Sequence, residues 1–250
     1  MGPFESLGHL DAEWPAPPHV HAGSTTRLGG FSPAPFDSLN LGLGSEDDPA
    51  TVLRNRQHLA KGLGLAADPV WLKQQHGVVT IDADAGIRDR RADASFAFQP
   101  NVSCAVLTAD CLPVLFCDRA GTRVAAAHAG WRGLAGRVLE SVLMRLRLPP
   151  EEVLVWLGPA IGPQRFEAGP EVRAAFEATD PGAGAAFRPG AGDRAYGDLF
   201  ALARRRLALR GVEAVYGGGV CTYDDPQRFF SYRRDGARTG RMASLIWMER

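Results

Sequence analysis

The chain has 250 residues, 45% of them hydrophobic and 22% charged, and its 28 basic and 28 acidic side chains cancel. This length and apolar fraction suit a folded protein with a substantial core and exclude a disordered chain. The balanced charge argues against nucleic acid or an anionic membrane as a partner, because no overall positive field attracts phosphates. No apolar run reaches the roughly 18 residues of a membrane span, and the first residues lack a signal-peptide pattern, so we expect a cytoplasmic protein.

In chain order, the first regular element expected is a helix. Residues 1–45 are rich in Gly, Pro and Ser and indicate short strands and loops. A helix is predicted over Pro49–Gly62, because Asp47 or Asp48 can cap it and Pro49 suits a first turn. No repeat and no linker long enough to separate two units is present, so we expect a single domain over residues 1–250.

Strand-length apolar runs then alternate with helical patterns. The runs that predict strands are 70–72, 78–82, 102–109, 113–118, 123–128, 153–157, 212–216 and 245–248. The predicted helices after the first are 130–147, 170–178 and 199–210. The Gly/Ala/Pro-rich stretch 180–192 is interpreted as a surface loop. Strands and helices mixed along one chain predict an α/β or α+β sandwich.

Three polar segments at the ends of predicted strands are the candidates for chemistry. Segment 74–77 contains His76, segment 108–113 contains Cys111 and segment 127–133 contains His128. Two imidazoles and one thiolate with a fourth position open are what a catalytic zinc requires. The alternative is that Cys111 is a small buried hydrophobe and the histidines are hydrogen-bonded structural residues, and spacing alone does not decide between them.

The other cysteines and histidines offer weaker signals. Cys104 and Cys117 fall within strand-like runs and are expected in the core as reduced thiols, while Cys221 is either structural or adjacent to a site. The pair His19 and His21 has the spacing of copper ligands, and His₂Cys is also a type 1 copper set. Since no methionine is placed by the sequence as an axial ligand, zinc is favoured over copper.

Several other polar residues are candidates for binding a substrate anion. Arg27 lies in a hydroxyl- and glycine-rich segment, 24–30, that could bind phosphate, and Asn40 could add an amide. Arg132, in the segment 127–133 that contains His128, is a further candidate. Residues 229–234 could line a pocket or form a strand with an exposed basic end.

Read together, the three segments carry a family resemblance. Gln-x-His-Gly, Thr-Ala-Asp-Cys-Leu-Pro-Val and Ala-His-Ala-Gly-Trp-Arg-Gly, in that order, resemble the YfiH/laccase-domain family, once called polyphenol oxidases. Further matching motifs extend over nearly the whole chain, among them Gly-Pro-Ala-Ile-Gly-Pro at 158–163 and Phe-Phe-Ser-Tyr-Arg-Arg at 229–234. The resemblance implies a mixed-sheet α/β (α+β) fold, an αββα-type sandwich of the YfiH-like kind. It also implies a zinc ion held by His76, Cys111 and His128.

The activity that the resemblance implies is purine nucleoside phosphorolysis, with adenosine, inosine and S-methyl-5′-thioadenosine as substrates and adenosine deamination as a side activity. Arg27 is the first candidate for phosphate, with Arg132 and Asn40 as further contacts. Cys111 and Asp110 are the expected catalytic residues, although neighbouring side chains on a strand point to opposite faces, so a role for Asp110 requires a bend there.

Three other functions stay open from the sequence. Copper-dependent oxidation of phenols is one. Another is a cysteine hydrolase acting on a cell-wall precursor, with Cys111 as nucleophile and His128 as base. The last is a binding module without catalysis.

Overall fold

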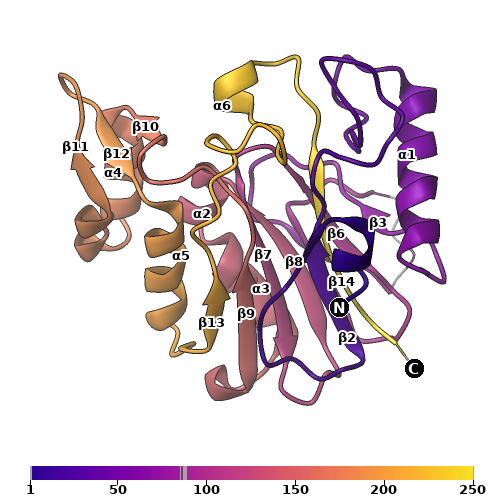
Figure 1. The fold of residues 1–250 in the computed structure, drawn as a ribbon. Helices are drawn as coiled ribbons and strands as arrows, with labels where there is room; N and C mark the ends of the chain where they lie inside the picture. The colour runs from indigo at the N-terminus through magenta and orange to yellow at the C-terminus, as the bar shows by residue number, and fades with distance from the viewer. Residues whose placement is uncertain (1, 85, 87–88, 250) are drawn as a thin grey trace.

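The computed structural model describes residues 2–84, 86 and 89–249, and its centre is a pair of mixed sheets with helices on both outer faces (Figure 1). This arrangement confirms the predicted α/β (α+β) sandwich of αββα type. The first sheet consists of β1 (Leu10–Asp11), β2 (Val20–Ser24), β14 (Met242–Met248), β6 (Cys104–Thr108) and β3 (Val70–Trp71), in that order. The second sheet consists of β13 (Val215–Gly217), β9 (Val153–Leu157), β7 (Leu112–Asp118), β8 (Val124–Ala129), β5 (Ala94–Ala97) and β4 (Thr80–Asp82).

Strand β7 is apolar at almost every position because it is buried on both of its faces. Alternate side chains of a strand point to opposite faces. Val114 and Phe116 pack under the helices on the outer face, whereas Leu115 and Cys117 pack in the core between the two sheets. Cys104 lies in this same inner core, so the expectation that Cys104 and Cys117 are buried is confirmed.

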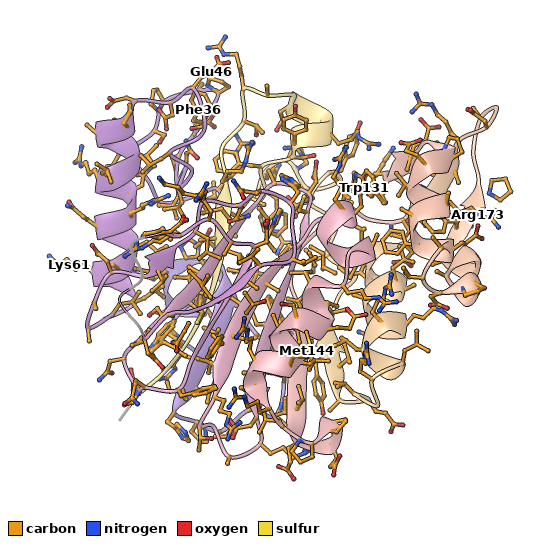
Figure 2. All side chains as sticks on the ribbon, turned by 180° about the vertical axis from the view of Figure 1, so that it is seen from behind. Phe36, Glu46, Lys61, Trp131, Met144 and Arg173 are labelled. Carbon is orange, nitrogen blue, oxygen red and sulfur yellow. The ribbon has the colours of Figure 1, made fainter. Side chains whose placement is uncertain are left out.

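Helices cover both outer faces of the sandwich. Helix α1 (Pro49–Gly62) has the predicted bounds and the predicted cap, because the Asp48 carboxylate accepts the N–H groups of Ala50 and Thr51. It lies on the first sheet, and Leu59 packs into the core there. The helices on the second sheet are α2 (Trp131–Ala135), α3 (Val138–Leu146) and α5 (Leu199–Ala208). Figure 2 shows α3 from behind, with Met144 on its solvent side. Among the described helices, none combines the length and apolarity needed to cross a membrane.

The single helix predicted over 130–147 is wrong, because the chain breaks it into α2 and α3. Arg137 has a φ of 78°, a left-handed conformation that ends the first helix and starts the second in a new direction. The apolar positions expected at every fourth residue are nevertheless all buried, and they are Leu134, Val138, Val142 and Leu146. The pattern therefore predicted the buried face correctly and missed the turn within it.

The interpretation of 180–192 as a plain surface loop is also wrong. This stretch contains a 3₁₀ helix over Pro181–Ala186 and strand β11 (Phe187–Pro189). Strand β11 pairs with β12 (Ala195–Gly197), which pairs with β10 (Glu167–Ala168), and helix α4 (Pro170–Glu177) packs beside this small sheet. Ala183 and Phe187 are buried there, so Gly and Pro in this stretch shape short elements instead of an open loop.

The histidine at position 9 makes the stability of this fold depend on pH. Burial, with a smaller effect from the charge of His58, lowers the pKa of His9 to about 4, and its Nδ1 accepts the N–H of Thr26. In the unfolded chain His9 takes up a proton near pH 6.5, whereas in the folded chain it does so only near pH 4. The free energy of unfolding therefore falls as the pH is lowered from 6.5 to 4.

We expect acidification from pH 7 to pH 4 to cost about 2 kcal/mol through His9, after solvent screening at this partly buried position. The measurement is the free energy of unfolding in urea across this range, with His9→Gln as the control that keeps a hydrogen-bond acceptor. Parallel pH profiles for the two proteins would contradict the prediction.

Candidate functional site

Two antiparallel neighbours in the second sheet bring Cys111 and His128 together. Strand β7 begins at Leu112, opposite Ala129 at the end of β8, so both strands terminate at the same edge of the sheet. His128 lies on the face of β8 that also carries Val124 and Ala126, which is the inner face of the sandwich. Cys111 directly precedes β7 at this edge.

The third residue, His76, comes from the connection between the two sheets. It lies between β3 of the first sheet and β4 of the second, where the chain crosses from one to the other. Its φ is 59°, in the left-handed region. The Nε2 atom of His76 lies 4.0 Å from the Cys111 Sγ, and the His76 and His128 rings meet edge to face at 4.8 Å between centroids.

This trio fits a metal ion of the zinc type. The three ligand atoms lie within 4.8 Å of one another, and the described residues contain no other cluster of three such side chains. A tetrahedral zinc needs these atoms about 3.3–3.8 Å apart, so a small inward movement of the side chains suffices. The donor set leaves a fourth position open for water or substrate, as in catalytic sites.

Electrostatics favour the thiolate form of Cys111 that a metal requires. Burial by itself would raise the pKa of the Cys111 thiol, but the charge of His128 and contacts with both imidazoles outweigh it and lower this pKa to about 6. Burial likewise opposes charge on His128, yet the Cys111 thiolate and the Asp93 carboxylate raise the pKa of His128 to about 9. The Cys104 thiol in the core between the sheets differs, because burial raises its pKa to about 12.

Gly130 provides the space in which the trio meets. A Cβ at this position would lie 2.9 Å from the Cys111 Sγ and 3.2 Å from the Cδ2 of His76. Its φ of −59° is allowed for any residue, so only the close approach of the two ligands requires glycine.

We therefore expect Gly130→Ala to weaken zinc binding at least about tenfold, since even small displacements of ligands reduce metal affinity on this scale, while the fold persists. Competition against a chromophoric chelator measures the affinity, and far-UV circular dichroism checks the fold. Gly64→Ala is the control for a loss of stability outside the site, because Gly64 has a φ of 67° and an added methyl group there would meet no atom within 4 Å. Wild-type affinity in Gly130→Ala would contradict the prediction.

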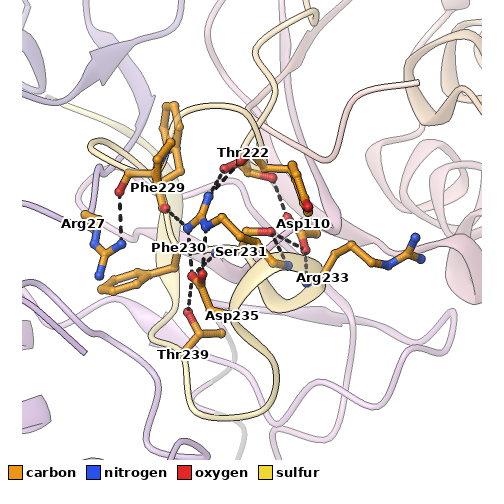
Figure 3. A network of polar contacts seen from close by, with 12 residues as sticks. Arg27, Asp110, Thr222, Phe229, Phe230, Ser231, Arg233, Asp235 and Thr239 are labelled. Atoms are coloured by element: carbon orange, nitrogen blue, oxygen red, sulfur yellow. Dashed lines mark hydrogen bonds and ion pairs between the residues drawn. The ribbon is translucent and has the colours of Figure 1, made fainter. Parts of the chain in front are cut away.

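Asp110 ties the start of β7 to a distant part of the chain (Figure 3). Its φ is 87°, which supplies the bend that a role for this side chain beside Cys111 requires. One carboxylate oxygen accepts the hydroxyl of Thr222 at 2.6 Å, and the other accepts the Ser231 hydroxyl at 3.0 Å and the Arg233 N–H at 2.7 Å. The carboxylate therefore holds the start of helix α6 (Tyr232–Asp235) beside Cys111.

A cavity of about 990 Å³ opens beside the trio, and all three ligands line it. Six basic side chains also line it, and they are Arg56, Lys73, Arg90, Arg132, Arg233 and Arg241. None of these six forms an ion pair with a described residue, whereas ten other arginines do. Asp110 is the one carboxylate among the lining residues, so the cavity has a strong excess of positive charge in a chain whose net charge is zero.

Arg241 is a cavity-lining cation whose charge interacts with that of Cys111. Its guanidinium donates to the carbonyls of Thr239 and Gly240, which leaves donors free. Burial lowers the pKa of Arg241, and the neighbouring charges of Cys111, Tyr232 and Asp110 oppose that effect.

The structure separates the predicted anion-binding residues. Arg132 lines the cavity, as do Tyr232 and Arg233 of the segment 229–234. This segment is not a strand, because residues 232–234 belong to helix α6 and 229–231 form no regular element. Arg27 and Asn40 are not among the lining residues. The Arg27 guanidinium donates to the backbone carbonyls of Asp37 and Pro226 and pairs with the Asp37 carboxylate.

Asn40 is buried behind the cavity wall and holds parts of its backbone by hydrogen bonds. Its amide oxygen accepts the N–H groups of Gly42 and Arg241, and its amide nitrogen donates to Asp47. Asn40 thus fixes the backbone of two residues that do line the cavity. The pair His19 and His21 lies on and beside β2, where the His19 ring contacts the Gly121 carbonyl and His21 pairs with Glu249.

Sequence reasoning missed Asp93, Gly130 and Arg241. Asp93 directly precedes β5, a four-residue strand that the patterns did not predict. Its carboxylate contacts the backbone of the His76 loop and the ring of His128. The available signal was the same one that identified Cys111, a polar residue at the end of a short apolar run.

Comparison with known proteins gives consistent matches over nearly the whole chain. The family described as multi-copper polyphenol oxidoreductase laccase matches residues 21–249. A protein of Pseudomonas aeruginosa named purine nucleoside phosphorylase is 56% identical over 241 residues, covering 96% of this chain and 98% of the relative. The Escherichia coli protein named purine nucleoside phosphorylase YfiH is 53% identical over 94% of this chain and 97% of its own.

Solved structures agree with these matches. A Neisseria meningitidis protein aligns with a TM-score of 0.93 and 50% identity over 97% of this chain and 99% of its own. YfiH of Bacillus licheniformis aligns with a TM-score of 0.86 and 30% identity over 92% of this chain and 93% of its own.

Proposed function

The chain belongs to the laccase-like YfiH family, as its motifs indicated, and we propose that it is a metal-dependent purine nucleoside phosphorylase. The relatives named purine nucleoside phosphorylase support the reaction class. The observation that carries the proposal is the cavity itself, in which a His-Cys-His trio adjoins six cations without acidic partners. An oxyanion substrate beside a metal is what this arrangement suits.

In the proposed reaction, an oxygen of inorganic phosphate attacks C1′ of the nucleoside while the C1′–N9 bond breaks. The electron pair of that bond leaves with the base, which takes up a proton, and the products are a free purine and pentose 1-phosphate. We assign phosphate binding to Arg132 and Arg241, whose guanidinium groups match the geometry of phosphate oxygens. Adenosine, inosine and S-methyl-5′-thioadenosine are the proposed substrates.

Zinc is the proposed metal, and held by His76, Cys111 and His128 it would supply a Lewis-acidic positive charge in the cavity wall. Asp110 is proposed as a positioning residue, because one of its oxygens accepts the Ser231 hydroxyl and the Arg233 N–H, in the segment that carries Tyr232 and Arg233 into the wall, while the other accepts the Thr222 hydroxyl. The purine is proposed to lie against the apolar part of the lining, which includes Leu72, Leu107, Ile161 and Phe166.

The test is a product analysis of the zinc-loaded protein incubated with adenosine, with and without phosphate. We expect ribose 1-phosphate only when phosphate is present, in an amount equal to the sum of adenine and hypoxanthine released, and loss of all three after the metal is removed by a chelator. Inosine and ammonia formed without phosphate would report the proposed deaminase side activity. Absence of pentose 1-phosphate under all conditions would rule out the phosphorylase.

One observation favours a second candidate, a thiol hydrolase. Cys111 contacts His128, and the other ring nitrogen of His128 lies 2.9 Å from an Asp93 oxygen, the order of groups found in a Cys-His-Asp triad. Alkylation of Cys111 in metal-free protein separates the two candidates. Activity that persists without metal and disappears on alkylation belongs to the hydrolase, whereas protection of the thiol by zinc belongs to the phosphorylase.

The family description also names polyphenol oxidation with copper. The thioether of Met242 accepts the Phe230 N–H in the core, and no methionine is among the residues that line the cavity, so the axial ligand usual in type 1 copper sites is not supplied there. Metal analysis of protein purified without added metal decides the matter. Zinc near one equivalent is the expected result.

A further inference from the structure

We propose that Asp93 is the positioning residue of the metal centre, a single carboxylate that orients two of the three ligands before any ion binds. The inference rests on the proposed metal site and not on the identity of the nucleoside. Asp93 is 1% exposed and lies between the trio and strand β5. Its contacts reach both His76 and His128, which are 52 positions apart in the sequence.

One set of contacts holds the loop that carries His76. The Asp93 Oδ1 accepts the His76 N–H at 2.8 Å, and Oδ2 accepts the Gly77 N–H at 2.7 Å, with the Gln75 N–H at 3.2 Å from both oxygens. His76 needs this support because its φ of 59° is unfavourable for a residue with a Cβ. The carboxylate therefore stabilises a backbone conformation that aims the imidazole at Cys111.

The second set fixes the ring of His128. The His128 Nδ1 lies 2.9 Å from the Asp93 Oδ1, and the His128 N–H donates to the Asp93 backbone carbonyl at 2.7 Å. An ionised carboxylate only accepts hydrogen bonds, so the proton of the neutral ring must sit on Nδ1. The lone pair of Nε2 is then left for a metal.

Replacing the carboxylate by an amide tests this geometry atom by atom. The carboxylate accepts from donors on both sides, three backbone N–H groups and one ring N–H. Asparagine has one accepting oxygen and one donating nitrogen, so either orientation places an NH₂ against a donor. If the NH₂ takes the place of Oδ1, it meets both the His128 ring and the His76 N–H, so Nδ1 must accept, the proton moves to Nε2, where it blocks the metal, and the His76 N–H loses its acceptor. If it takes the place of Oδ2, it meets the Gly77 N–H, and the loop that follows His76 loses that support.

The experiment compares Asp93→Asn with Asp118→Asn in the full-length chain. Asp118 is a matched control, because it is 4% exposed, lies at the far end of β7, and accepts the N–H groups of Thr122 and Arg123 and the Thr122 hydroxyl. Zn²⁺ affinity is measured by competition with a chromophoric chelator, Co²⁺ coordination by its visible absorption, and the stability of the metal-free proteins by urea unfolding.

We expect Asp93→Asn to lower Zn²⁺ affinity about 10- to 100-fold and to change the Co²⁺ spectrum, while Asp118→Asn loses stability and keeps wild-type affinity. Equal affinity in Asp93→Asn and wild type would overturn the inference, as would parallel losses of affinity in Asp93→Asn and Asp118→Asn.

If Asp93→Asn does not fold, Asp93→Glu is used, and an unchanged Co²⁺ spectrum of that variant overturns the inference. A wild-type chain that binds zinc but splits no nucleoside overturns only the proposed function, and one that binds neither ion overturns both.

Discussion

Cys111→Ala is expected to abolish phosphate-dependent cleavage of purine nucleosides, with kcat/KM falling by about 10³-fold or more. The thiolate is the one anionic ligand in the trio, and without it two imidazoles must hold the ion alone. Metal ions contribute several kcal/mol to stabilising charge in a transition state, which corresponds to a rate factor of this size.

The matched control for this variant is Cys117→Ala, in strand β7, which begins directly after Cys111. Cys117 is fully buried in the core between the sheets, so its truncation costs packing but touches no ligand. Zinc content, kcat/KM and thermal stability are measured for both variants. Retention of one zinc and of wild-type rate by Cys111→Ala would remove the metal site from the mechanism, whereas loss of activity in both variants in step with stability would point to misfolding.

Arg241→Met is expected to raise the KM for phosphate about 10- to 100-fold, because each hydrogen bond from a charged donor to the anion contributes about 1.5–3 kcal/mol. Methionine retains most of the aliphatic volume and removes the charge. Gly42 packs against the aliphatic part of this side chain, and that contact should survive. The effect is expected mainly in the KM for phosphate and less in the KM for the nucleoside.

Arg238→Met supplies the comparison for Arg241→Met. Arg238 lies three residues earlier in the chain, is 68% exposed and pairs with Glu46 at the surface. Steady-state kinetics with phosphate and nucleoside varied independently distinguish the two positions. A KM for phosphate that stays at the wild-type value in Arg241→Met would assign the anion to other cations of the cavity, and Arg132→Met would be examined by the same assay.

Local patterns predicted those elements whose residues alone determine them. Helix Pro49–Gly62 has an aspartate cap, a proline in its first turn and an apolar face, and all of these act within one or two turns. Strand β9 (Val153–Leu157) is an apolar run after two prolines and was predicted with its observed bounds. The break at Arg137 was not predicted, because the apolar residues of α2 and α3 belong to one buried core and keep the same spacing through the left-handed residue between the helices, so periodicity does not reveal it.

The same division holds for the functional site. The sequence by itself determined the neutral composition, the class of fold and the three candidate ligands, since each ligand adjoins an apolar strand and lies in a recognisable motif. Only the tertiary structure decided that Arg241 and not Arg27 lines the cavity. Both arginines lie close to threonine and glycine in the sequence, so their local sequences do not distinguish them.

The folded chain also decided the charge of the site. Basic residues far apart in sequence line one cavity without acidic partners, although the whole chain has no net charge. The contact between Asp93 and His128 likewise depends on a strand pairing. Strand β5 pairs with β8, and this pairing brings the Asp93 carboxylate to the His128 ring. Electric fields and hydrogen bonds depend on distances in space, and those distances are set by long-range packing that no local pattern encodes.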